Sequence, residues 1–95
     1  MLEFEWSKRK ATSNQKKHGV SFEEARTVFF DESAIQYHDP DNSDQEERFI
    51  LLGLSFRPQA LVVCHCFRES ETVVRIISAR KADKVEKKAY WEQRK

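Results

Sequence analysis

Residues 49–81 read FILLGLSFRPQALVVCHCFRESETVVRIISARK, three apolar runs divided by two short polar segments. The runs Phe49–Leu54, Leu61–Phe67 and Thr72–Ala79 have the length and composition of β-strands. The segments between them are as short as hairpin turns, so the strands are predicted to pair antiparallel in chain order. The first run is apolar throughout, which predicts a strand covered on both faces.

The residues at the amino end predict one strand followed by one helix. Apolar and acidic residues alternate over Leu2–Trp6, which is the period of a half-buried strand. A helix over about residues 8–18 follows and ends at Gly19, because glycine readily adopts the left-handed conformation that closes helices. This helix is so polar that Ala11 and Asn14 are the residues expected to face the core.

A second helix and a fourth strand are predicted between this helix and the apolar runs. Ser21 and Glu24 have the spacing of a capping box, in which the hydroxyl and the carboxylate each accept a backbone N–H. The helix that they open should end near Phe30. Apolar and polar residues then alternate over Ala34–His38, which predicts the first strand of a four-stranded antiparallel meander.

The last element is predicted to be a helix opened by a second capping box at Asp83 and running to about Gln93. Val85 and Ala89 are expected to face the core. The predicted order is β-α-α-β-β-β-β-α. This order defines an α+β fold, a small two-layer domain in which two N-terminal helices and a C-terminal helix pack on an antiparallel β-meander. Residues 1–95 are expected to form one domain.

Composition excludes several classes of function. The 95 residues have a formal net charge of +1, a mean hydropathy of −0.76 and no apolar run of the ~20 residues that span a bilayer. Two glycines cannot build a glycine-rich dinucleotide or nucleotide-triphosphate loop, so no cofactor is expected. Two cysteines, Cys64 and Cys66, favour a reducing cytoplasmic location. They alternate with His65 along a strand, so the three side chains are not expected to share a metal ion.

Charge is unevenly distributed along the chain. Basic residues predominate in residues 1–20 and 48–95, and acidic residues predominate in residues 21–47. Such a chain can present one surface to phosphate and another to a basic partner.

The last strand carries the most informative cations. Arg75 lies inside an apolar run, and Arg80 and Lys81 lie at the end of the strand, beside the start of the last helix. Arg48 and Arg68 lie near the ends of neighbouring strands, so the five cations are predicted to form a phosphate-binding cluster. Arg75 and Arg80 have opposite parity along an ideal strand, so a bulge is required for both to reach one site.

Several motifs together resemble a known family. They are Phe4–Trp6, Asn14, Lys17–Ala25, Val28–Asp31, Glu46–Phe49, Leu61–His65 and Arg75–Ala82. With these motifs, nearly the whole chain resembles BrnT-type toxins. The resemblance implies a RelE-like fold and a bacterial type II toxin–antitoxin component. It also implies a ribonuclease that blocks translation and a neutralising BrnA-type antitoxin. The ribbon-helix-helix part of that antitoxin would bind operator DNA.

The resemblance and the analogy with related RNA-cleaving folds also imply roles for individual residues. The RNA 2′-hydroxyl would be the nucleophile and no metal would be needed. His65 would transfer a proton, because imidazole titrates near neutrality. Arg75 and Arg80 would clamp the phosphate, with Arg68 in the turn after His65 completing the catalytic group. The remaining predicted RNA-binding residues are Lys16, Lys17, Arg48 and Lys81.

Two alternatives to an enzyme follow from the same residues. One is a non-catalytic RNA- or protein-binding module that keeps the basic cluster and has no turnover. The other is an interaction module whose acidic loop, residues 39–47, binds a basic partner.

Overall fold

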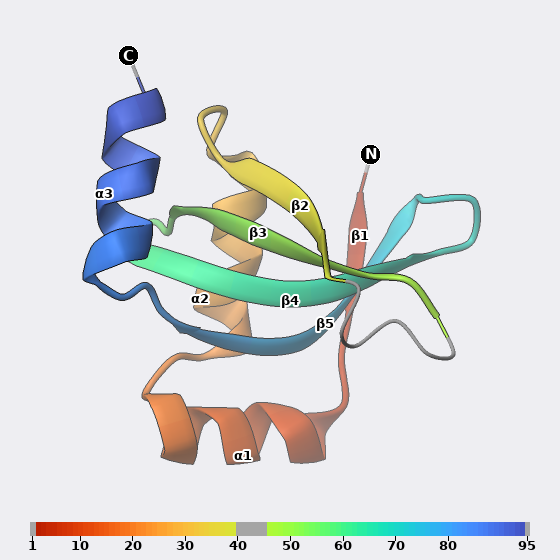
Figure 1. Ribbon diagram of the computed structural model, residues 1–95. Coiled ribbons are helices and arrows are strands. Elements are labelled where there is room, and N and C mark those ends of the chain that lie inside the picture. Colours follow the sequence, from red (N-terminus) through yellow and green to blue (C-terminus); the bar gives the residue numbers. More distant parts are fainter. Residues whose placement is uncertain (1, 40–45, 95) are drawn as a thin grey trace.

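The structure, a computed structural model, describes residues 2–39 and 46–94 (Figure 1). Residues 40–45 of the predicted acidic loop lie outside the described residues. In chain order the elements are β1 (Glu3–Glu5), α1 (Lys8–His18), α2 (Phe22–Thr27), the 3-10 helix η1 (Val28–Phe30), β2 (Ile35–Asp39), β3 (Arg48–Leu54), β4 (Ala60–Arg68), β5 (Val73–Lys81) and α3 (Lys84–Gln93). The predicted α+β class and element order are confirmed.

The strands form one sheet in the order β1-β5-β4-β3-β2. Strands β2 to β5 pair antiparallel with their chain neighbours, as the hairpin-length connections predict. β1 pairs parallel with β5, Glu5 lying opposite Arg75, and it extends the sheet by one short edge strand. Because β1 ends at Glu5, the described residues provide no strand on that side for the rest of β5.

A β-bulge in β5 determines which face each of its side chains occupies. Along β4 the paired residue of β5 changes from Ser78 to Ile76 between adjacent positions, so Ile77 is an extra residue. The bulge reverses the alternation, and Arg75, Ser78 and Arg80 therefore lie on one face of the sheet. The bulge that the parity of Arg75 and Arg80 requires is thus present.

The main core lies between the sheet and the helices α1 and α2. It is built from Val20, Phe22, Ala25, Val28, Leu51, Leu61, Val63, Val74, Ile76 and Ala79. Asn14 of α1 is buried, as predicted, and its carboxamide bonds the unpaired edge of β5. The Nδ2 atom donates to Ala79 O at 2.8 Å and to Val20 O at 3.0 Å, while Oδ1 accepts from Ala79 N at 3.0 Å. The side chain thereby takes the place of a neighbouring strand.

The opposite face of the sheet, called the open face below, is covered by α3 at one end (Figure 1). A second apolar cluster forms there around Tyr90, which is fully buried and whose hydroxyl donates to Asp31 Oδ2 at 2.6 Å. The prediction that Val85 and Ala89 face the core is wrong, because both are exposed. The helix is rotated so that the large ring of Tyr90 is buried instead.

Only one of the two predicted capping boxes is complete. Asp83 and Glu86 exchange both bonds at the start of α3. At α2 the Ser21 hydroxyl accepts from Glu24 N at 3.0 Å, but the Glu24 carboxylate does not return the bond. It is buried and instead accepts hydrogen bonds from Ser55 Oγ and Gln59 Nε2, both at 2.6 Å. The carboxylate therefore anchors the β3–β4 hairpin to α2.

Within the described residues, no helix is both long and apolar enough to cross a membrane.

Candidate functional site

A pocket of about 230 Å³ opens on the open face, beside the part of α3 that packs there. Its floor comes from β3, β4 and β5, and the end of α1 reaches it from beside the unpaired edge of β5 (Figure 1). We call it the cationic pocket. Its polar lining residues are His18, Asp39, Arg48, Cys64, Ser78 and Arg80.

Arg80 lies at the rim of the cationic pocket and is held by α3. Its Nη1 and Nη2 atoms donate to the two carboxylate oxygens of Glu86, both at 2.8 Å. The hydrogen bonds from Arg80 hold the pKa of Glu86 below its ordinary value, and those to Glu86 raise the pKa of Arg80. The pair is therefore ionised at neutral pH; Glu86 occupies the bidentate edge of the Arg80 guanidinium, and the Arg80 side chain is 43% exposed.

Arg48 is the second cation of the pocket, at the start of β3. It lies opposite Asp39 of β2, and both side chains line the pocket. Arg48 and Arg80 therefore line one pocket, as predicted. The carboxylate of Asp39, which lines the same pocket, balances part of their positive charge.

His18 lines this pocket and Tyr37 lies next to its lining, although the predicted set omits both. His18 follows the exposed turn of Lys16 and Lys17 at the end of α1 and lines the pocket. Tyr37 lies opposite Ile50 in the sheet, and the same row of cross-strand neighbours continues through Cys64 and Ser78. Ile50, Cys64 and Ser78 line the pocket.

Burial raises the pKa of Tyr37, and the nearby charge of Glu86 raises it further, so the phenol is protonated at neutral pH. It can therefore donate a proton or a hydrogen bond. Burial also raises the pKa of Cys64 despite nearby Arg48, which keeps this thiol protonated and a poor nucleophile.

Arg68 and Arg75 form a separate cluster on the open face. Arg75 Nη1 donates to Glu5 Oε2 at 2.8 Å, and Arg68 lies 3.6 Å from the same oxygen and 3.5 Å from Glu46. Both arginines are on the same side of the sheet as Arg80 but do not line the cationic pocket.

His65 lies on the other face of the sheet, in the core. It is fully buried, its Nδ1 lies 3.1 Å from Val63 O, and its Nε2 lies 3.1 Å from Gln36 Oε1. The Phe29 ring packs edge-on at 4.8 Å. Burial lowers the pKa of His65 to about 4, so the ring is neutral at neutral pH. The proton-transfer role predicted for His65 has no support in this geometry, because the sheet separates the ring from Arg80.

The predicted lysines lie away from the cationic pocket. Lys16 borders a separate hollow between α1 and α2, and Lys17 is exposed beside it. Lys81, next to Arg80, lines another pocket, which borders α3. Within residues 2–39 and 46–94, no group of three or more His, Cys, Asp or Glu residues is arranged to hold a metal ion.

Comparison with known proteins places the chain in a family. Residues 6–86 match the model of a family described as the ribonuclease toxin, BrnT, of type II toxin–antitoxin systems. The protein is therefore a ribonuclease toxin of a toxin–antitoxin system. It belongs to the BrnT family, which confirms the resemblance drawn from its motifs.

The crystal structure of the Brucella abortus ribonuclease toxin BrnT has a similar fold. The two chains share 19% identity, with a TM-score of 0.67 over 88% of this chain and 100% of the Brucella chain. No curated protein sequence gives a significant match.

Proposed function

We propose that this toxin is a metal-independent endoribonuclease that stops translation in the cytoplasm by cutting RNA, and that the cationic pocket is its active site. The observation that carries the proposal is the convergence of two arginines and an imidazole around one pocket of about 230 Å³, with the protonated phenol of Tyr37 beside its lining. These are the groups needed to move protons and to stabilise charge on a phosphate.

In the proposed reaction the RNA 2′-hydroxyl attacks the adjacent phosphorus. The imidazole of His18 accepts the hydroxyl proton as the O2′–P bond forms. Arg48 and Arg80 stabilise the charge on the equatorial oxygens of the phosphorane. The P–O5′ bond then breaks, and Tyr37 donates its proton to the leaving oxygen. The products are a 2′,3′-cyclic phosphate and a 5′-hydroxyl.

The other predicted cations have positions outside the pocket that suit the RNA backbone. Arg68 and Arg75 lie on the open face beyond the pocket and can bind flanking phosphates once these replace Glu5. Lys16 and Lys17 are exposed at the end of α1 that bears His18. This arrangement assigns positioning roles to the four residues and leaves the chemistry to the pocket.

The ion pair between Arg80 and Glu86 provides a sharp test. Arg80→Ala removes a cation from the phosphorane and should lower kcat about 100-fold or more. Glu86→Gln keeps Arg80 and an acceptor for the helix cap, while removing the carboxylate that competes with phosphate. This variant should cleave RNA at least as fast as the wild type.

The matched control is Arg9→Ala, an exposed arginine of α1 away from the pocket. It should change kcat by less than about twofold, since its loss removes only a distant charge. Equal rates for wild type and Arg80→Ala would refute the proposed site. RNA that is bound by the wild type and never cut, free or on ribosomes, would support the RNA-binding module instead.

We further propose that a BrnA-type antitoxin neutralises the toxin by covering the open face. Arg75 and Arg80 already pair with Glu5 and Glu86, and the covering segment should carry Asp or Glu that replaces or supplements these carboxylates. Its ribbon-helix-helix part would bind operator DNA, and the toxin would reach that DNA only through it. A structure of the complex that leaves both arginines open to solvent would contradict this mode of neutralisation.

A further inference from the structure

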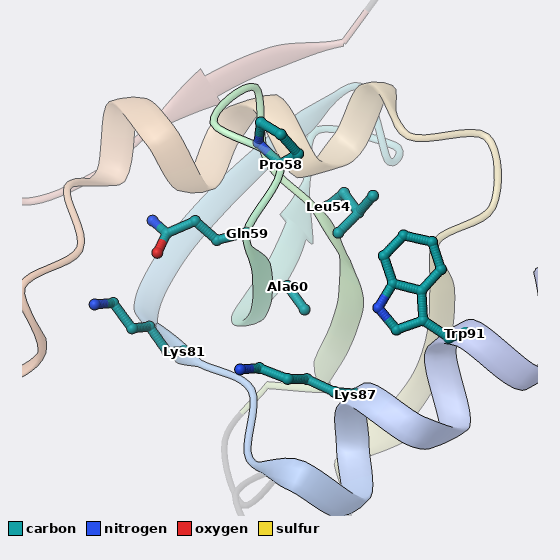
Figure 2. A pocket seen from close by; sticks show the side chains of 7 residues that line it. All are labelled: Leu54, Pro58, Gln59, Ala60, Lys81, Lys87 and Trp91. Carbon is teal, nitrogen blue, oxygen red and sulfur yellow. The ribbon is translucent and has the colours of Figure 1, made fainter.

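We propose that a second pocket binds one nucleotide of single-stranded RNA next to the cut, with its base on Trp91 and its phosphate on Lys81 and Lys87. The inference rests on the proposed function, because it concerns the same RNA. The pocket has a volume of about 370 Å³ and lies between the β3–β4 hairpin, the end of β5 and α3 (Figure 2). Leu54 and Ala60 form its apolar part.

Trp91 gives the pocket an aromatic surface. The residue is 52% exposed. The neighbouring Tyr90 ring meets the indole edge-on at 5.2 Å, and the Arg94 guanidinium lies over the indole, 5.2 Å from its centroid. Figure 2 shows the indole nitrogen on the side of the ring that faces Ala60. A half-exposed aromatic ring is suited to stacking with a nucleobase, which presents a flat π-face of its own.

Two lysines supply positive charge beside this ring. Lys81 comes from the end of β5 and Lys87 from α3, and Figure 2 shows the Lys87 side chain reaching across the pocket toward Lys81. In the part of the chain that the structure describes, neither lysine forms an ion pair with a carboxylate, whereas Arg80 does. The two ammonium groups are therefore ready to bind a phosphate.

Gln59 borders the pocket from the β3–β4 hairpin. Its amide nitrogen donates to the buried carboxylate of Glu24 at 2.6 Å, and Figure 2 shows its carboxamide pointing away from Trp91. The aromatic face and the two cations are therefore the parts of the pocket suited to a nucleotide.

The second pocket adjoins the cationic pocket through shared elements. Arg80 lines one pocket and Lys81, the next residue, lines the other. On α3, Glu86 holds Arg80 and the next residue, Lys87, lines the second pocket. In this proposal, an RNA strand whose reacting phosphate lies at Arg80 places a nearby nucleotide against Trp91.

Fluorescence of Trp91 tests the proposal without any cleavage. The chain has two tryptophans, so Trp6→Phe leaves Trp91 as the reporter. The ligand is a short 2′-O-methyl oligonucleotide, which lacks the proposed nucleophile and stays intact. It should quench the fluorescence in a saturable way, whereas an abasic oligonucleotide of equal length and inorganic phosphate should not.

Variants of two neighbouring lysines separate the pocket from general charge. In the Trp6→Phe background, Lys87→Gln should weaken oligonucleotide binding about fivefold or more, and Lys88→Gln, an exposed lysine outside the pocket, less than about twofold. With cleavable RNA, Trp91→Ala should raise KM about 5- to 100-fold and leave kcat within about twofold.

Absence of quenching by the oligonucleotide, equal quenching by the abasic strand, or equal losses from the two lysine variants would overturn this nucleotide site. Failure of the proposed function has a different signature, because the wild type would then cut no RNA whatever the fluorescence titration shows.

Discussion

Asn14→Ala tests whether a side chain of α1 stands in for a missing strand beside β5. The change removes three hydrogen bonds of 2.8–3.0 Å and leaves the buried N–H and C=O of Ala79, together with Val20 O, without these partners. Each such bond is worth about 0.5–1.5 kcal/mol net, and the better helix propensity of alanine returns about 0.5 kcal/mol. The free energy of unfolding should therefore fall by about 1–4 kcal/mol.

Urea denaturation followed by circular dichroism measures this loss. With a slope of about 2 kcal/mol per M, the midpoint should fall by about 0.5–2 M. The control is Ser13→Ala, the exposed neighbour on the same helix, which should stay within about 0.5 kcal/mol of the wild type. An Asn14→Ala variant that also stays within about 0.5 kcal/mol would refute the reasoning, because the three bonds would then contribute nothing.

Three further predictions concern stability. Burial lowers the pKa of His65 to about 4, whereas the unfolded chain has an ordinary value near 6.5. The free energy of unfolding should therefore fall by about 3 kcal/mol as pH falls from 6.5 to 4. Urea titrations at each pH measure this fall, and His65→Gln should abolish it. Gly53→Ala places a Cβ 2.8 Å from a neighbouring side-chain carbon and should lower the free energy of unfolding by about 3 kcal/mol. Gly19→Ala meets only the strain of φ 69° and should lower it by about 1 kcal/mol. Equal shifts of the melting temperature would contradict this. Burial alone would raise the pKa of Asp31, but hydrogen bonds from Tyr90 and two backbone N–H groups lower it. The ionised carboxylate therefore stabilises the fold above about pH 4, and this stabilisation is lost as pH falls through the lowered pKa. In acid titrations of the free energy of unfolding, Tyr90→Phe should show a smaller loss than the wild type.

The meander and the helix boundaries follow from local signals, and this is why the sequence predicts them well. Hairpin-length connections force neighbouring strands together, and Gly19 and Asp83 mark helix ends through their own backbone chemistry. The parallel pairing of β1 with β5 joins residues about 70 positions apart, as Glu5 and Arg75 show. No local pattern encodes such a contact.

The inward face of α3 was not predictable from periodicity because the helix is weakly amphipathic. Val85 and Ala89 are its small apolar residues, yet a larger gain comes from burying the ring of Tyr90 and bonding its hydroxyl to Asp31. The reach of that hydroxyl depends on where α3 meets the end of the sheet, which only the tertiary structure provides.

The candidate site was predictable in part. Arg48 and Arg80 meet at one pocket, as their positions at strand ends suggest, and the required bulge lies at Ile77. His65 drew attention because of its residue type, but its position in a central strand buries it. His18 belongs to the motif Lys17–Ala25, but as the last residue of a predicted helix it carries no separate signal of a site.

Cleavage of end-labelled RNA by the purified toxin in EDTA tests the central claim most directly. The account predicts discrete fragments that end in a 2′,3′-cyclic phosphate, produced by the wild type and lost in Arg80→Ala, with translating ribosomes supplied if free RNA is not cut. Fragments that appear only when a divalent metal is added, that end in a 3′-hydroxyl, or that form equally with Arg80→Ala would contradict it.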